Sequence, residues 1–254
     1  MSGGLAGRRV LLTRRWPELV ASLSSAGATV AEVPALALKP PPDLPALDAA
    51  LRALPDYEWV VFTSAHAVDA VVARMEALGV TMPAGIRMAS VGPVTSQAIL
   101  AAWPGAHVEV QPESEFRGLS LVAKFKEREL RAQRVLLPVS DRAADVVEKG
   151  LAARGARVDR LVAYQTTASD SRERFREELH VGLDLVAFAS PSAVEAFCAA
   201  VGEAGLGAPA VVIGPTTAAA ARAAGLDVLA VADTADAPGM MRALERAMGG
   251  TRHG

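Results

Sequence analysis

The sequence repeats itself. Three segments of its first half return in its second half, in the same order and at offsets close to half of the 254-residue chain. The matching pairs are residues 9–13 and 134–138, residues 62–70 and 188–196, and residues 91–95 and 213–217. Chance similarity does not preserve both order and spacing, so we infer a duplication. It predicts two similar lobes built on one plan.

The hydrophobic pattern indicates what each lobe contains. Short apolar runs alternate with longer segments of helical periodicity along the whole chain. This alternation is typical of strands in a parallel sheet that are connected by helices. The fold class that we predict is therefore α/β, with two similar lobes, each a parallel sheet flanked by helices.

Each copy opens with a strand, a helix and a long extended segment, at residues 29–38 and 158–166. We expect these two segments to run side by side as a two-stranded hinge. The first lobe is then discontinuous, with residues 1–37 and 168–254, and the second lobe holds residues 38–167.

Composition excludes several classes of partner. A net charge of −2 provides no general attraction for nucleic acid or for an anionic membrane. The chain shows no signal-peptide pattern and no membrane-spanning apolar run. We therefore expect a cytoplasmic monomer that binds neither nucleic acid nor a membrane. The single cysteine, Cys198, leaves no disulfide within the chain, and we expect it to be buried. The histidines lack ligand spacing, which predicts no metal; they are His66, His107, His180 and His253.

Four corners of the predicted lobes share one design, in which a buried strand leads through small or polar residues into a helix. The residues concerned are Ser64, Gly92, Thr95, Ser190, Ser192, Gly214, Thr216 and Thr217. Free N–H groups and the helix dipole make such a corner attractive to carboxylates and phosphates. Helix capping alone explains any single corner, but four equivalent corners favour anion binding. Neither a P-loop nor a dinucleotide fingerprint is present.

Three larger side chains are also candidates. Arg14 and Arg142 follow the first strand of their copies, where a guanidinium suits a bidentate carboxylate contact, although a solvated arginine is the alternative. Tyr164 lies in the second extended segment. Its phenol could donate a proton inside a cleft, or the ring could simply pack.

These segments resemble the uroporphyrinogen-III synthase family over nearly the whole chain. Each motif is short, and it is their order and spacing that make the set specific. The motifs that carry the resemblance are residues 12–14, 60–64, 89–92 with Thr95, 162–166, 188–194 and 213–218.

The resemblance implies a cyclising lyase of tetrapyrrole biosynthesis. Its substrate is the linear polycarboxylate hydroxymethylbilane, which is closed to uroporphyrinogen III with loss of water and inversion of ring D. No cofactor is implied. Tyr164 matches the family tyrosine that is proposed to assist departure of the hydroxyl, and the corner residues with Arg14 and Arg142 would bind the substrate. The linear substrate also closes unaided to the non-inverted isomer, so the enzyme's task is largely positioning.

Two other classes of protein fit parts of the pattern. A two-lobed protein that binds or senses a small anion without chemistry would also need two similar lobes and hinge strands. A two-lobed glycosyltransferase would need a nucleotide site, and the chain shows no diagnostic one.

Overall fold

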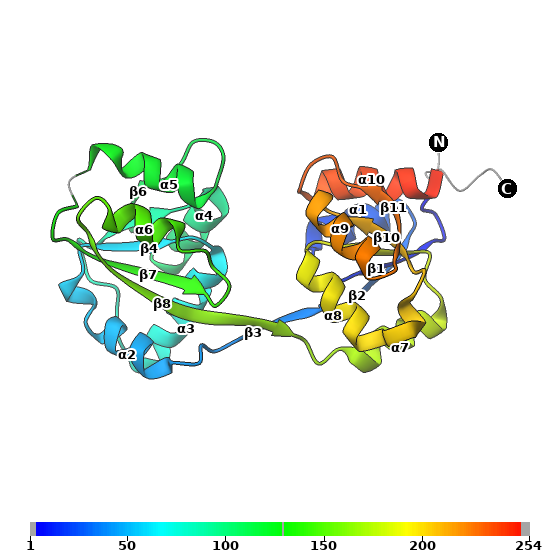
Figure 1. Ribbon diagram of the computed structural model, residues 1–254, viewed down its shortest axis with the longest axis horizontal. Helices are drawn as coiled ribbons and strands as arrows, with labels where there is room; N and C mark the ends of the chain where they lie inside the picture. Colours follow the sequence, from blue (N-terminus) through cyan, green and yellow to red (C-terminus); the bar gives the residue numbers. More distant parts are fainter. Residues whose placement is uncertain (1–3, 129, 250–254) are drawn as a thin grey trace. The chain divides into compact units, whose positions relative to one another are not determined.

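The structure is a computed structural model that describes residues 4–128 and 130–249. The chain divides into two compact units, which we call unit 1 (residues 1–37 and 167–254) and unit 2 (residues 38–166). Each unit contains a sheet with helices packed against it (Figure 1). The predicted α/β class is confirmed.

Unit 1 contains a five-stranded parallel sheet in the order β11-β10-β9-β1-β2. Its strands are β1 (Arg9–Leu12), β2 (Thr29–Glu32), β9 (Leu185–Phe188), β10 (Pro209–Val212) and β11 (Asp227–Val231). One core lies under α1 (Pro17–Ser25) and α10 (Ala237–Gly249). The other core lies under α7 (Arg172–Val181), α8 (Pro191–Val201) and α9 (Pro215–Ala223).

Unit 2 is built around a sheet in the order β3-β8-β7-β4-β5-β6. The strands are β3 (Leu36–Lys39), β4 (Trp59–Phe62), β5 (Arg87–Ser90), β6 (Val108–Val110), β7 (Arg134–Ser140) and β8 (Arg157–Ala168). One face packs on α2 (Leu44–Arg52), α3 (Ala65–Leu78) and α4 (Pro93–Ala102). The other packs on α5 (Gly118–Lys124) and α6 (Val146–Ala152).

The two sheets have the same order once the duplication is taken into account. Strands β1 and β2 of the first copy correspond to β7 and β8 of the second, and β4, β5 and β6 correspond to β9, β10 and β11. With these substitutions the order β11-β10-β9-β1-β2 becomes β6-β5-β4-β7-β8. Each of these five-strand arrangements therefore takes two strands from one copy and three from the other.

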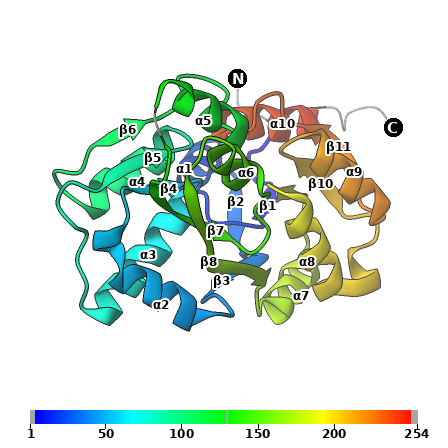
Figure 2. The same cartoon turned by 60° about the vertical axis from the view of Figure 1, so that its left-hand side comes forward.

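The first extended segment departs from the prediction. Residues 29–38 do not form one strand: β2 joins the unit 1 sheet, and β3 lies beside β8 in the other sheet. Both chain crossings between the units fall within β3 and β8, which are neighbours in that sheet (Figure 1, Figure 2). Within the described ranges, no helix has the length and apolarity that crossing a membrane requires.

A carboxylate binds the start of the first strand of each copy. In unit 1 the backbone N–H of Arg9 donates to Asp184 at 2.8 Å, and the side chain of Arg8 pairs with the same carboxylate at 2.7 Å. In unit 2 the backbone N–H of Arg134 donates to Glu58 at 2.6 Å. Partial burial raises the pKa of Asp184, but the bonds from Arg9 and Arg8 outweigh it and hold that pKa below its ordinary value.

We predict that Asp184→Asn will lower the free energy of unfolding of unit 1 by about 1–2 kcal/mol at pH 7, because a partly buried charged acceptor is lost. A lowered native pKa stabilises the fold above the ordinary pKa of 3.8, and this contribution disappears as the pH falls through the native value. Urea unfolding should therefore show a larger difference at pH 7 than near pH 3. The exposed Asp170→Asn is the control, and an equal loss at both pH values would contradict the assignment.

Candidate functional site

The predicted corners lie at the carboxyl ends of neighbouring parallel strands. In unit 2, Ser64 follows β4, Gly92 follows β5 and Arg142 follows β7. In unit 1, the equivalent ends of β1, β9 and β10 are followed by the segments with Arg14, Ser190 and Gly214. In each sheet the strand order progresses in opposite directions on the two sides of one central pair, which is β1/β9 in unit 1 and β7/β4 in unit 2. Ligands of open α/β sheets bind at the carboxyl ends of the strands beside such a reversal.

Two of the corners have serine caps. Ser64 and Ser190 adopt extended backbone conformations, and each side chain accepts a hydrogen bond from the N–H three residues later, at 3.1 and 3.2 Å. Both serines are partly buried. Each cap leaves other N–H groups of the first helical turn without an intrahelical acceptor, so the corners can still donate to an anion.

Tyr164 distinguishes the unit 2 corner. Its hydroxyl lies 3.1 Å from the hydroxyl of Ser64, and either group can donate. Tyr164 stands on β8 beside Ser140 of β7, and the turn after β7 is tied to β8 because the N–H of Asp141 donates to the Tyr164 carbonyl. The Tyr164 hydroxyl is thus paired with Ser64, its backbone is tied to the turn after β7, and only 8% of the residue is exposed.

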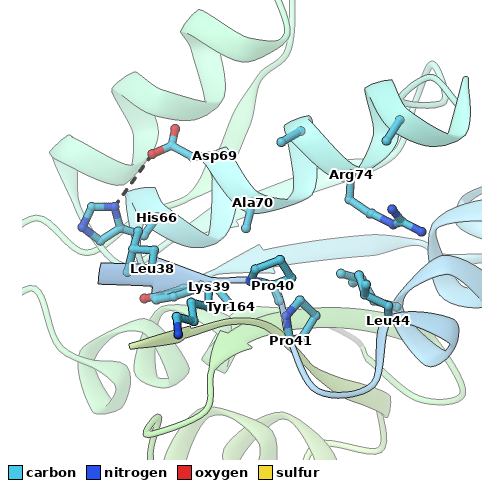
Figure 3. Close-up of a pocket in the computed structure, with 14 residues that line it drawn as sticks. Leu38, Lys39, Pro40, Pro41, Leu44, His66, Asp69, Ala70, Arg74 and Tyr164 are labelled. Atoms are coloured by element: carbon cyan, nitrogen blue, oxygen red, sulfur yellow. Dashed lines mark ion pairs between the residues drawn. The ribbon is translucent and has the colours of Figure 1, made fainter. Parts of the chain in front are cut away.

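Tyr164 also lines a pocket within unit 2 with a volume of about 370 Å³ (Figure 3). The pocket lies between α3 and the segment that connects β3 with α2, and its walls are largely apolar. The lining residues are Leu38, Lys39, Pro40, Pro41, Leu44, Leu47, His66, Asp69, Ala70, Ala73, Arg74, Ala77, Ala163 and Tyr164. The volume is at the lower end of the range for ligand pockets, so only part of a large ligand would fit.

The charged side chains around this pocket differ in how they are paired. Arg74 forms two bonds of 2.6 Å with Asp48, which lowers the pKa of Asp48. His66 lies 3.8 Å from Asp69, and its ring makes an edge contact with Tyr164 at 6.0 Å. Lys39 is exposed at the rim, and the described part of the chain gives it no ion pair. Lys39 is thus available to a carboxylate.

Some predicted residues have little side-chain access. Thr95 and Thr217 are only 4% and 3% exposed, on the core side of α4 and α9, so their hydroxyls are poor candidates for a direct ligand contact. Thr216 is exposed, and Ser192 is partly buried. The 3.6-residue period decides this difference, because adjacent threonines at a helix start face different sides.

The glycines and arginines complete the set. Gly92 and Gly214 precede α4 and α9 with extended backbones that do not themselves require glycine. Arg14 is exposed, and its guanidinium lies 5.0 Å from the ring of Trp16. Arg142 is also exposed. The structure therefore brings Ser64 and Tyr164 into contact and places the other candidates at strand ends.

Sequence reasoning missed Lys39 and His66. Lys39 is the only cation between residues 33 and 47, which is a signal that could have identified it. His66 follows the Ser64 corner by two residues, and its direction depends on the helix that begins there.

Two expectations concern metals and thiols. Over the described ranges, no three or more histidine, cysteine or acidic side chains gather as a potential metal site; His253 lies outside those ranges. Cys198 is partly buried rather than fully buried, and it packs against the core under α7–α9. This burial raises the pKa of the Cys198 thiol, which disfavours the reactive thiolate.

Two α/β units, serine-capped corners at strand ends and a tyrosine hydrogen-bonded to one cap place the chain among two-unit α/β proteins. Comparison with known proteins identifies the family. The model of the family described as uroporphyrinogen-III synthase HemD matches residues 17–242. The chain belongs to this family, and the resemblance noted in the sequence is confirmed.

Named relatives agree with this assignment. A uroporphyrinogen-III synthase of Synechococcus elongatus is 33% identical over 206 residues, which cover 76% of this chain and 75% of the relative. A chloroplastic uroporphyrinogen-III synthase of Oryza sativa is 28% identical over 213 residues, 82% of this chain and 69% of the relative.

Solved structures show the same fold. A mutant uroporphyrinogen III synthase of Thermus thermophilus is 22% identical with a TM-score of 0.59, and the match covers 96% of this chain and 100% of that one. A uroporphyrinogen-III synthetase of Helicobacter pylori is 14% identical with a TM-score of 0.61, over 93% and 97% of the two chains.

The paired serine corners allow a direct measurement of the tyrosine contact. We predict that Ser190→Ala will cost about 0.5–2 kcal/mol through loss of its cap. Ser64→Ala should cost about 0.5–1.5 kcal/mol more, because the Tyr164 hydroxyl also loses its partner. Hydrogen exchange of the β9 and β4 amides reports the two units separately. In a Tyr164→Phe background the two serine changes should cost the same, and a persistent difference would argue against the contact.

Proposed function

We propose that this chain closes hydroxymethylbilane to uroporphyrinogen III, with loss of water and inversion of ring D. The observation that carries the proposal is the family match over residues 17–242. The reaction would serve the synthesis of tetrapyrroles such as haem. A binding protein or sensor without catalysis is the alternative that the assay below separates from it.

Tyr164 fits the first chemical step. The hydroxymethyl carbon–oxygen bond must break, and the leaving oxygen needs a proton to depart as water. The phenol of Tyr164 would supply this proton, and Ser64, 3.1 Å away, can donate to the oxygen that is left with a negative charge. The pyrrole that carried the hydroxyl becomes an azafulvene with an electrophilic methylene carbon. Ring D attacks this carbon through its own substituted carbon and gives a spiro intermediate, which then rearranges and closes.

The remaining candidates would hold the substrate. Carboxylate side chains of the bilane would accept from N–H groups at the corners of Ser64, Gly92, Ser190 and Gly214, and Arg14 and Arg142 would supply charge. We add Lys39, which is exposed at the rim of the Tyr164 pocket. Because four linked pyrroles exceed a pocket of about 370 Å³, this pocket would receive only a part of the substrate.

We further propose that residues 1–37 with 168–254 and residues 38–167 act as two domains. The separate cores of units 1 and 2 support this division. We also propose that the protein is a cytoplasmic monomer. It would require no cofactor or metal and bind no nucleic acid. Sedimentation of the purified protein tests the monomer.

The assay for the activity supplies fresh hydroxymethylbilane and resolves the uroporphyrin isomers after oxidation. We expect isomer III as the main product, formed faster than the spontaneous closure. Formation of isomer I alone at the uncatalysed rate would contradict the enzyme and favour the binding protein.

For Tyr164→Phe we predict a several-fold or greater loss of turnover with the fold intact, because the proton donor is removed. Tyr57→Phe is the matched control. The Tyr57 phenol also donates to a neighbour, Asp159 at 2.5 Å, and burial together with this bond raises the pKa of Tyr57. It lies before β4, at the opposite end of that strand from Ser64. Tyr57→Phe should therefore reduce stability and leave turnover unchanged. Equal turnover of Tyr164→Phe and the wild type would remove the proposed role.

A further inference from the structure

The two copies differ most clearly at one pair of equivalent corners. At Gly214 in unit 1, a methyl group added to the α-carbon would meet no other atom within 4 Å. At Gly92 in unit 2, the same methyl group would lie 2.9 Å from Cγ of Phe116. The side chain of Phe116 therefore covers the backbone of Gly92, and any larger residue at this position would displace it.

Phe116 is unusual because it remains 50% exposed while it packs on Gly92. It lies two residues before Gly118, the first residue of α5. The exposed Val94, in the first turn of α4, follows Gly92 by two residues. An exposed aromatic side chain thus stands beside the Gly92 corner, whereas no atom lies within 4 Å of the same added methyl group at Gly214.

The segment that carries Phe116 is anchored by a buried polar chain. The hydroxyls of Ser90 and Ser96 are 2.6 Å apart, and Ser96 donates to Gln111 at 2.5 Å. Gln111 begins the segment that leads to Phe116. Just before the ring, Glu115 adopts a positive φ of 50°, a conformation that costs energy in a non-glycine residue.

The second copy shows that this polar chain is not needed to form the corner. Its equivalents of Ser90 and Ser96 are Val212 and Ala218, which are fully or almost fully buried in an apolar core. The same strand–turn–helix therefore forms with apolar residues. Buried hydroxyls must be paired to avoid a penalty, so their presence in unit 2 alone indicates a task specific to the segment that they hold.

We propose that Phe116 is a substrate-contacting residue that receives the face of one pyrrole ring, and that Ser90, Ser96 and Gln111 are positioning residues for it. This inference rests on the proposed function and adds a residue to its site. Phe116 stands at the carboxyl end of β5, next in the sheet to β4 with the Ser64 corner. Aromatic faces prefer offset or edge contacts with other flat rings, so Phe116 would restrict the direction of the ring that it holds.

The test compares Phe116→Ala with Phe116→Tyr, which keeps the ring, and with Leu119→Ala, which removes another exposed apolar side chain three residues later. We expect Phe116→Ala to raise KM by about 2- to 10-fold, the range of a single aromatic contact, and to lower the share of isomer III. Phe116→Tyr and Leu119→Ala should behave as the wild type. Wild-type KM and isomer share in Phe116→Ala would overturn the proposal.

A second pair of variants tests the positioning residues. Ser90→Val with Ser96→Ala installs the residues of the second copy, and it should lower the isomer III share while circular dichroism and urea unfolding show an intact fold. In a Phe116→Ala background the same changes should have no further effect on the isomer share, since their role acts through the ring. Full additivity would contradict a positioning role.

Binding of uroporphyrin III, followed by its fluorescence, separates this inference from the activity. Weaker binding to Phe116→Ala than to Leu119→Ala supports the contact even if the wild type forms only isomer I, a result that would overturn the proposed function alone. Equal binding to both variants, with an active wild type, would overturn the contact and leave the function standing.

Discussion

The pairing of β1 with β9 and of β7 with β4 is the constraint on which the rest of the structure depends. Strand β1 pairs in parallel with a strand that begins more than 170 residues later, and without it β1 and β2 would expose a sheet edge. In both units a carboxylate accepts a hydrogen bond at the start of this strand: Asp184 from the N–H of Arg9, and Glu58 from the N–H of Arg134. These pairings place the Ser64 corner next to the strand that leads to Arg142. The candidate site is therefore a consequence of the exchange of strands between copies.

Much of the fold could be predicted because local signals and the duplication agree. The helix expected at residues 65–78 is found at those bounds, since Ser64 caps its start and Gly79 ends it with a φ of 64°. The break in residues 29–38 has a signal in Pro34, which cannot donate to a sheet ladder, but the sequence does not show that the two halves belong to different sheets. The exposed Thr216 and the buried Thr217 could not be separated either, since the local pattern does not fix which face of α9 meets the core.

The electrostatics of the site follow from its position at strand ends. The chain has a net charge of −2, so a polycarboxylate is not attracted by the protein as a whole. Helix starts provide N–H donors without adding net charge, and they need no counter-ion when the site is empty. Arg74 is neutralised by Asp48, whereas Lys39 is exposed at the pocket rim. A few local cations added to backbone donors would suffice to orient several carboxylates.

The differences between the copies matter more for the proposed reaction than their likeness. Ring inversion treats one of four linked pyrroles differently from the others, so residues present at one corner and absent at its equivalent are the first candidates for distinguishing that ring. Unit 2 adds Tyr164 at its serine cap and Phe116 at its glycine corner, where unit 1 has a cap alone and an open glycine. Both additions stand at neighbouring strand ends of one sheet. Duplication explains the shared scaffold and its donors. The two additions in unit 2 come from both copies, since Tyr164 belongs to the second copy and Phe116 to the first.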